Sequence, residues 1–250
     1  MQDNKVKVKS LYKALKLLDY FSAKQSTLGV SEIAEKECLP KSTVSNIFST
    51  FCAYGLLEQV PESGKFKLGP KLAKLSNIYF STNSSSKVLK AQMEEVSKKI
   101  DENVYFGVLF EDQVLYLEAV YYSSMNKNSS VVGVAAPLYC TGIGKCLLAW
   151  SDEELFNRVA NSNMIKFTDN TITDPTELKD ELKKTLDRGY AIDNMEHEYG
   201  IKCIAVPIFN SNDVLQGAMS ITCPSLRMDG KFEEYSKLLH DVQQTLKQYI

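Results

Sequence analysis

Residues that build metal centres and disulfide frameworks are scarce in this sequence of 250 residues. It contains only two histidines, and its six cysteines are scattered through apolar segments without a CxxC pair. Because a zinc site draws its ligands mainly from Cys and His, we expect no metal site and no cofactor. In a chain without an export signal, isolated cysteines are typical of reduced, mostly buried thiols.

Long apolar runs are also missing. No segment approaches the roughly 20 apolar residues that cross a bilayer. The N-terminal stretch MQDNKVKVKS has lysines but lacks the apolar core of a secretory signal. We therefore expect a cytoplasmic protein with no membrane partner.

Charge is distributed unevenly along the chain. Residues 1–75 hold 12 lysines and 7 acidic residues, a net charge of +5, whereas residues 76–250 carry a net charge of −7. A basic N-terminal third joined to an acidic remainder suits a nucleic-acid-binding module on a regulatory body, although this signal alone is weak.

The stretch most informative about function is LPKSTVSNIFSTFCAYGLLEQVPESGKFKLG, residues 39–69. Apolar residues at 44, 47, 48 and 51 predict a helix over 41–54 with one buried edge, and Gly55 is placed to end it. Alternating strands are predicted over 57–60 and 65–68 around a turn at 61–64. With helices expected over 10–23 and from a Ser31 cap to Pro40, this order indicates a winged helix-turn-helix.

The exposed edge of that third helix suits the major groove of DNA, where base edges offer a distinct donor and acceptor pattern. Asn46 can pair with adenine through two hydrogen bonds, and short hydroxyl side chains can serve bases or phosphates. Lysines 5, 7 and 9 could also contact the phosphate backbone of the DNA. The predicted DNA contacts are Lys41, Ser42, Thr43, Ser45, Asn46, Lys65 and Lys67.

The rest of the chain predicts an α+β domain in which helices flank an antiparallel sheet. A short helix over 71–82 and a linker over 81–86 precede it. Strand pairs are expected over 103–110 with 114–122 and over 201–209 with 214–222. Helices are expected over 87–101, 144–150, 152–160, 175–188 and 230–249.

The sequence resembles the IclR family of bacterial transcription regulators over nearly its whole length. The resemblance is carried by ALKLLDYF (14–21), residues 28–58, GKFKLGPKL (64–72), APLYCTGIGKCLLA (136–149), residues 171–193 and EHEYGIKCIAVPIF (196–209). It implies a winged helix-turn-helix domain over 1–69, a linker helix over 70–86, and a GAF-like effector-binding and oligomerisation domain over 87–250.

The same resemblance implies a function and its partners. We expect a repressor that binds a palindromic double-stranded DNA operator as a homodimer or a dimer of dimers. The expected effector is a small carboxylate such as a keto acid or sugar acid. Family members often carry His-Arg where this chain has Ser45-Asn46, so the operator sequence does not transfer. Tyr139 stands where histidine is frequent, and LYCTGIGK is closer to regulators of sugar-acid catabolism.

A candidate effector site follows from the loop at 141–145, which opens a helix. Free backbone N–H groups at a helix start bind anions, and glycine allows close approach, although glycine also serves any tight turn. A P-loop is excluded by Tyr139 and Cys146. By family resemblance, the strand residues at 193, 203, 220 and 222 line the pocket. The predicted effector residues are Thr141, Gly142, Ile143, Asp193, Cys203, Ser220 and Thr222.

Two other functions remain as alternatives. Cys203, His197 and Asp193 are the residue types of a nucleophile, a base and an orienting group, which a Cys-dependent enzyme would need. We nevertheless expect no catalytic residues. A metabolite sensor acting through a protein partner instead of DNA is the second alternative.

Overall fold

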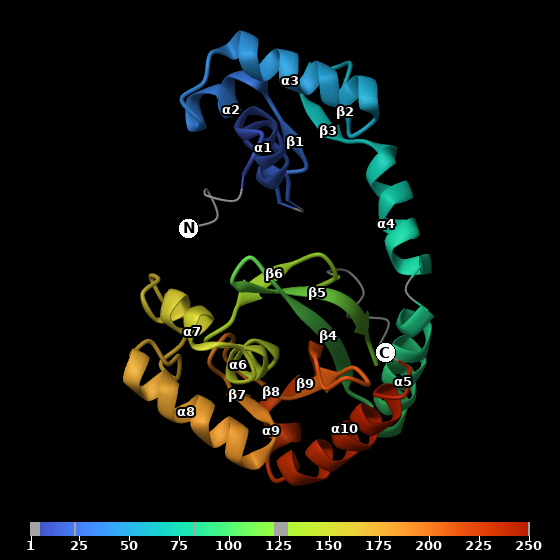
Figure 1. Ribbon diagram of the computed structural model, residues 1–250, viewed down its shortest axis with the longest axis vertical. Coiled ribbons are helices and arrows are strands. Elements are labelled where there is room, and N and C mark those ends of the chain that lie inside the picture. Colours follow the sequence, from blue (N-terminus) through green and yellow to red (C-terminus); the bar gives the residue numbers. More distant parts are fainter. Residues whose placement is uncertain (1–5, 23, 83, 123–129, 250) are drawn as a thin grey trace. The chain divides into compact units, whose positions relative to one another are not determined.

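The chain forms two compact units, Met1–Asn83 and Ser84–Ile250 (Figure 1). The computed structural model describes residues 6–22, 24–82, 84–122 and 130–249. The described part of the N-terminal unit contains four α-helices, one 3₁₀ helix and a three-stranded sheet. Its elements are α1 (Lys9–Lys16), η2 (Leu17–Tyr20), β1 (Thr27–Leu28), α2 (Val30–Lys36), α3 (Lys41–Tyr54), β2 (Leu57–Gln59), β3 (Phe66–Leu68) and α4 (Pro70–Thr82).

The wing of this unit is held by two glycines. Gly55 ends α3 in the left-handed conformation with a φ of 84°, as predicted. The N–H of Leu56 donates to the Phe51 carbonyl at 2.8 Å, and the N–H of Gly55 donates to Cys52 at 2.9 Å, which together form a Schellman motif. A Cβ on Gly69 would lie 2.4 Å from the Gly55 carbonyl oxygen, so only glycine lets the end of β3 return to the helix end.

Three predictions for this unit were wrong in detail. The first helix leaves the α conformation at Lys16 and continues as a 3₁₀ turn to Tyr20. Gly29 takes the N-cap of α2, so Ser31 lies inside the helix and does not cap it. The sheet also has a third strand, β1, which pairs with β3. Two residues are too few to show an alternating pattern.

The C-terminal unit is built on one antiparallel sheet of six strands in the order β6-β5-β4-β9-β8-β7. Its elements are α5 (Ser84–Ile100), β4 (Asn103–Phe110), β5 (Gln113–Val120), β6 (Ala135–Pro137), α6 (Gly142–Ala149), α7 (Glu153–Ala160), α8 (Pro175–Arg188), β7 (Ala191–Asn194), β8 (Ile201–Phe209), β9 (Leu215–Pro224), α9 (Ser225–Met228) and α10 (Phe232–Leu246).

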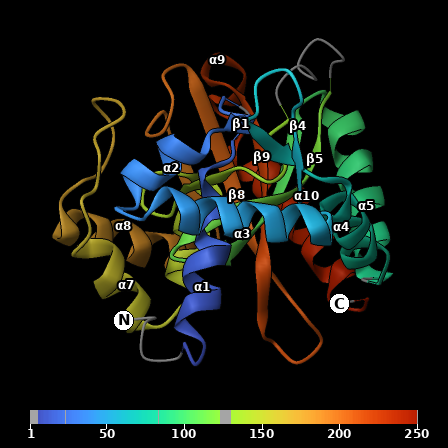
Figure 2. The same ribbon diagram turned by 90° about the horizontal axis from the view of Figure 1, so that it is seen from above.

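Helices cover both faces of this sheet and create two separate cores. In β8, Ile204 and Val206 pack with α5 and α10, whereas Ala205 between them faces α6. The period of two therefore divides each central strand between the cores. Both ribbon views show α5 and α10 running along the same side of the unit (Figures 1 and 2).

The predicted α+β class and antiparallel sheet are confirmed, but β6 and β7 were missed. The boundary between the two units lies within the predicted linker over 81–86, whose described residues are helical. α4 extends to Thr82 and α5 begins at Ser84, and Asn83 between them lies outside the described residues. Asp174 accepts hydrogen bonds from the N–H groups of Thr176 and Glu177, and Gly189 ends α8 with a φ of 83°, as predicted.

Candidate functional site

The second helix of the helix-turn-helix is anchored on one side and exposed on the other. Val44 and Phe48 of α3 are fully buried in the N-terminal core, which fixes the rotation of the helix. Viewed from above, α3 crosses the front of its unit with no other described element over it (Figure 2). Its outer face carries five predicted DNA contacts, all exposed: Lys41, Ser42, Thr43, Ser45 and Asn46.

This outer face has the chemistry of a base-reading surface. Residues 41–54 include no acidic side chain, so nothing on α3 repels phosphate. The Thr50 hydroxyl donates to the Asn46 carbonyl oxygen at 2.8 Å. Among the described residues the amide of Asn46 has no hydrogen-bond partner, which leaves it available for a base edge.

The predicted wing lysines differ in their surroundings. Lys65 is exposed at the end of the turn between β2 and β3. Lys67 in β3 lies 3.1 Å from the carboxylate of Glu58 in β2, which neutralises part of its charge. Lys65 is therefore the better phosphate ligand of the two. Lys7 and Lys9 are exposed, and Lys5 lies outside the described residues.

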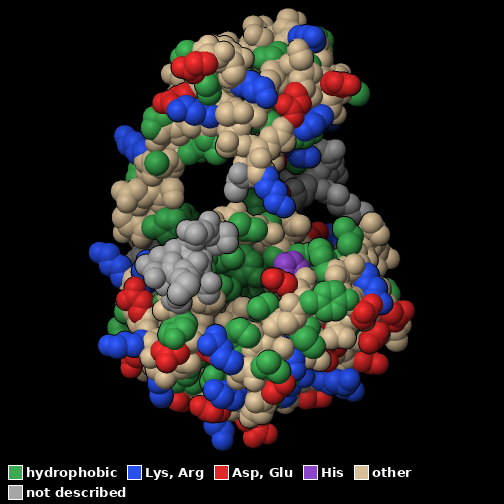
Figure 3. Space-filling model, turned by 180° about the vertical axis from the view of Figure 1, so that it is seen from behind, with side chains coloured by type: hydrophobic (Ala, Val, Ile, Leu, Met, Phe, Trp, Pro, Cys, Tyr) green, Lys and Arg blue, Asp and Glu red, His purple; other side chains and the backbone are tan. Residues whose placement is uncertain are grey.

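A cavity of about 450 Å³ opens in the C-terminal unit beside the first turn of α6. Figure 3 shows this unit hollowed, with hydrophobic side chains lining the hollow. All seven residues predicted for the effector line the cavity, and they come from α6 and three neighbouring strands: Thr141, Gly142, Ile143, Asp193, Cys203, Ser220 and Thr222.

Strand register explains why the predicted strand residues meet. Cys203 of β8 pairs with Thr222 of β9 on one side and with Asp193 of β7 on the other. In the next row, Ala205 pairs with Ser220. Since directly paired residues share one face of a sheet, the polar side chains of Asp193, Thr222 and Ser220 and the thiol of Cys203 lie together on the face under α6, with Ala205 beside them.

The start of α6 lies directly on this surface. The Thr141 hydroxyl caps the helix by accepting from the Gly144 N–H at 3.0 Å. A Cβ on Gly142 would lie 3.1 Å from the Cβ of Cys203, so a larger residue would push the helix away from β8. Within the described residues the N–H groups of Gly142 and Ile143 donate to no protein acceptor, and they remain available to an anion.

The cavity is lined mainly by uncharged groups. Burial raises the pKa of the Asp193 carboxyl to about 7. Burial also raises the pKa of the Cys203 thiol well above its ordinary value, and the Thr222 hydroxyl donates to its sulfur at 3.3 Å. A thiol held neutral is a poor nucleophile, and burial lowers the pKa of His197. This electrostatic environment disfavours cysteine catalysis.

The described residues were also compared with the requirements of a membrane-spanning helix and of a metal site. Within residues 6–22, 24–82, 84–122 and 130–249, no helix is long and apolar enough to cross a membrane. The same ranges contain no group of three or more His, Cys, Asp or Glu arranged to hold a metal ion.

Tyr139 does not line the cavity. Its hydroxyl donates to the Ile165 carbonyl at 2.9 Å.

Comparison with known domain families decides the identity of the fold. Residues 79–248 match the family described as "Bacterial transcriptional regulator IclR C-terminal", and residues 10–61 match the "IclR helix-turn-helix domain". The chain belongs to the IclR family. It is a transcriptional regulator with a DNA-binding helix-turn-helix domain and an effector-binding domain, and its named relatives are regulators rather than enzymes.

Three relatives illustrate this membership. The HTH-type transcriptional regulator KdgR of Escherichia coli is 33% identical over 215 residues, which cover 85% of this chain and 82% of that protein. The transcriptional repressor IclR of E. coli is 25% identical, with coverage of 93% and 86%. An IclR homologue from Microbacterium hydrocarbonoxydans, crystallised with 4-hydroxybenzoate, has a TM-score of 0.80, 24% identity, and coverage of 95% and 97%.

A buried ion pair lies behind the cavity of this IclR-family domain. Lys145 of α6 is completely buried, and its Nζ lies 2.5 Å from Oε1 of Glu196 and 3.8 Å from Glu181 of α8. The Glu196 N–H donates to the Asp193 carboxylate at 2.8 Å, which links the pair to the cavity wall. We did not predict this pair, although a lysine inside the apolar helix segment GIGKCLLA was a visible signal.

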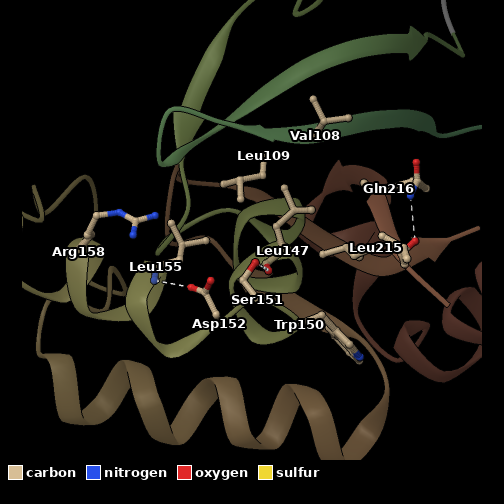
Figure 4. A pocket seen from close by; sticks show the side chains of 12 residues that line it. Val108, Leu109, Leu147, Trp150, Ser151, Asp152, Leu155, Arg158, Leu215 and Gln216 are labelled. Atoms are coloured by element: carbon tan, nitrogen blue, oxygen red, sulfur yellow. Dashed lines mark hydrogen bonds between the residues drawn. The ribbon is translucent and has the colours of Figure 1, made fainter. Parts of the chain in front are cut away.

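A second hollow in the same unit is a weaker candidate (Figure 4). It has a volume of about 390 Å³ and lies at the turn between α6 and α7. Its polar side chains are already bound within the fold. Asp152 caps α7 at the Leu155 N–H, Ser151 donates to the Leu147 carbonyl, and Arg158 pairs with Asp112. It contains none of the predicted effector residues.

The buried pair predicts a large loss of stability in Lys145→Met. This change leaves Glu196 buried without its counterion, and breaking such a pair costs about 3–5 kcal/mol of unfolding free energy. Urea unfolding followed by the fluorescence of Trp150, the only tryptophan in the chain, measures the effect in this unit.

Two variants serve as controls for this loss. Lys179→Met removes an exposed ion pair with Glu153, so we expect a change below about 1 kcal/mol. Adding Glu196→Gln to Lys145→Met should restore part of the stability, because it removes the unpaired charge. A Lys145→Met protein as stable as Lys179→Met would contradict the assignment of a charged buried pair.

Proposed function

We propose that this protein is a repressor whose C-terminal cavity binds a small carboxylate such as a keto acid or sugar acid, and whose α3 reads the operator. The convergence of the seven predicted residues on one cavity beside a free helix start is the observation that carries the proposal. The 4-hydroxybenzoate bound by the Microbacterium homologue is also a carboxylate, and the E. coli relative is named a repressor.

The carboxylate is assigned to the end of the cavity at α6. There the N–H groups of Gly142 and Ile143 meet the hydroxyls of Ser220 and Thr222, which supply hydrogen-bond donors without a formal positive charge. The helix dipole adds partial positive charge at the same point. The two N–H groups and the Ser220 hydroxyl donate to the oxygens of the carboxylate, and the Thr222 hydroxyl does so once it leaves the sulfur of Cys203.

We further propose that the protein is a homodimer, assembled in part through α1 and α4. Neither helix contains a buried residue, yet both carry apolar faces. Leu11 and Leu15 of α1 are 54% and 43% exposed, and Leu75 and Tyr79 of α4 are 45% and 49% exposed. A second copy would cover these faces and place two α3 helices at half-sites roughly 34 Å apart or a multiple of that.

Coupling between the two domains follows from linkage. Effector bound in the cavity alters operator affinity only if it binds one dimer or tetramer geometry more tightly than another. In this scheme the dimer or the dimer of dimers is the bistable element, and the cavity biases it.

The DNA assignment is tested with Lys41→Ala combined with Asn46→Ala. We expect operator binding to be lost, because the pair removes one phosphate or base contact and the amide suited to adenine. A gel mobility-shift assay would use DNA selected by the wild-type protein from a random pool. The matched control Lys183→Ala removes one exposed lysine of the C-terminal unit and should leave binding intact.

Two results would count against α3 as the reading helix. One is unchanged affinity in the double variant. The other is a protein that selects no DNA, or whose binding ignores salt, since each phosphate contact contributes a log–log slope of about −0.9. The first result would leave DNA binding to another part of the protein, whereas the second would favour a sensor that acts through a protein partner.

The dimer assignment predicts dissociation in Leu75→Ser with Tyr79→Ser. The two changes remove apolar area from the proposed contact, and sedimentation should show a higher dissociation constant for the dimer together with weaker operator binding. Asn77→Ser lies on the opposite side of α4 and should leave both unchanged. Wild-type association in the double variant would exclude this face.

The pKa of Asp193 predicts pH-dependent effector binding. A bound carboxylate disfavours a second negative charge nearby, so it should raise the pKa of Asp193 above about 7 and take up a proton. Effector affinity should then increase as pH falls from 8 to 6, by up to about tenfold per unit where Asp193 is ionised. Calorimetric titration in buffers of different ionisation enthalpy measures both the affinity and the proton uptake.

Asp193→Asn distinguishes Asp193 from other titrating groups. The amide mimics the neutral acid, so this variant should bind with little pH dependence. His197 also lines the cavity, but burial lowers its pKa, and its protonation occurs at lower pH. An unchanged pH profile in Asp193→Asn would show that another group is responsible.

A further inference from the structure

The cavity wall built by β4 and β5 carries polar side chains that are not assigned to binding the carboxylate. Tyr105 of β4 pairs with Ser220 of β9, and Asn103 pairs with Thr222, so both extend the polar surface away from α6. Tyr116 of β5 joins them at the cavity. The wall therefore continues the two rows that hold the anion.

The tyrosine rings are held in place by one another. The ring of Tyr105 lies 6.0 Å from that of Tyr116 and 5.8 Å from that of Tyr121, both in edge-to-face geometry. The Tyr121 hydroxyl accepts the N–H of Val131 at 2.8 Å, so it has a structural role. Fixed rings direct the other two hydroxyls without a large entropic cost to a ligand.

Within the described part of the chain the hydroxyl of Tyr116 has no hydrogen-bond partner, and the hydroxyl of Tyr105 has only the side chain of Asn103. Burial raises the pKa of both phenols far above the ordinary value, so both stay protonated at any physiological pH. Both phenols line the cavity, where a ligand hydroxyl can exchange hydrogen bonds with them. Two neutral donors and acceptors thus face the cavity.

Charge at the cavity mouth argues against a second acidic group on the ligand. Arg227 is the only arginine of the lining, and its guanidinium is 2.7 Å from the buried carboxylate of Glu102. Glu198 adds an exposed negative charge at the same lining. The end of the cavity opposite α6 is therefore suited to neutral hydroxyl groups.

We infer that the effector is a monocarboxylate whose chain carries several hydroxyl groups, the chemistry of an aldonic acid, and that Tyr105 and Tyr116 are the residues that select those hydroxyls. This inference rests on the proposed carboxylate function. It separates the effector from short keto acids, which would reach only the α6 end, and from fatty acids, which would leave both phenols without a ligand partner.

The test compares acids that differ in one feature, by calorimetric titration of the full-length protein. The panel contains gluconate, galactonate and mannonate as hydroxylated acids, hexanoate without hydroxyls, glucarate with a second carboxylate, and pyruvate as a short keto acid. We expect at least one aldonate to bind roughly a hundredfold more tightly than hexanoate, because a site that hydrogen-bonds hydroxyls rejects analogues that lack them.

Tyr105→Phe and Tyr116→Phe remove one hydroxyl each and keep the ring. Each should weaken the aldonate by about threefold to tenfold and leave pyruvate unchanged. Tyr249→Phe, which removes an exposed phenol outside the cavity, is the matched control. Thermal unfolding of each variant shows whether it is folded, and the binding of pyruvate by the variants reports the α6 end.

The outcomes separate the two proposals. If hexanoate or pyruvate binds as tightly as every aldonate, or if both phenylalanine variants bind the aldonate normally, the hydroxyl inference is overturned while the carboxylate function stands. If no acid in the panel binds the wild-type protein, both are overturned. Tighter binding of glucarate than of any aldonate would overturn the monocarboxylate assignment.

Discussion

The close contact between the first turn of α6 and strand β8 determines the architecture of the effector domain. It requires glycine at 142 and a small residue at 205, since a Cβ on Gly142 would already lie 3.1 Å from Cys203. The contact places unpaired N–H groups over a polar row of the sheet, and it also draws Lys145 inward. Lys145 enters the core with Glu196 as its counterion, and Glu196 in turn holds Asp193. The cavity, the position of the helix dipole and the buried ion pair thus all depend on how closely α6 approaches β8.

Much of this site could be predicted from sequence because strands alternate with a period of two. Ser220 and Thr222 necessarily share a face, and the family resemblance supplied Cys203 and Asp193 as their neighbours. The tyrosine wall could not be predicted in the same way. Tyr105 meets Ser220 only because β4 pairs with β9, a partnership between strands more than a hundred residues apart. Short strands such as β6 and β7 were missed because three or four residues show no pattern.

The N-terminal unit shows a different limit of sequence patterns. The apolar edge of α3 was assigned correctly because its partners lie in the same unit, where Val44 and Phe48 are fully buried. The equally regular stripe on α1 is exposed at Leu11 and Leu15. The spacing of apolar residues predicts that one face of a helix is buried, but it does not identify the surface that covers this face. An apolar stripe left exposed in one chain therefore points to contacts between chains.

The two domains differ in how their positive charges are arranged. DNA is a polyanion, and the N-terminal unit meets it with lysines and an α3 without acidic residues, so affinity comes from charge and depends on salt. The proposed effector is a small carboxylate, and a cavity with a free lysine would bind any anion. Here Lys145 and Arg227 are each occupied by a glutamate, and the lining offers N–H and O–H donors instead. Binding through neutral donors depends more on the shape of the ligand than on its charge, because each donor must meet an oxygen at hydrogen-bond distance. Selectivity for one metabolite among many cellular anions therefore depends on keeping the positive charges of this domain paired.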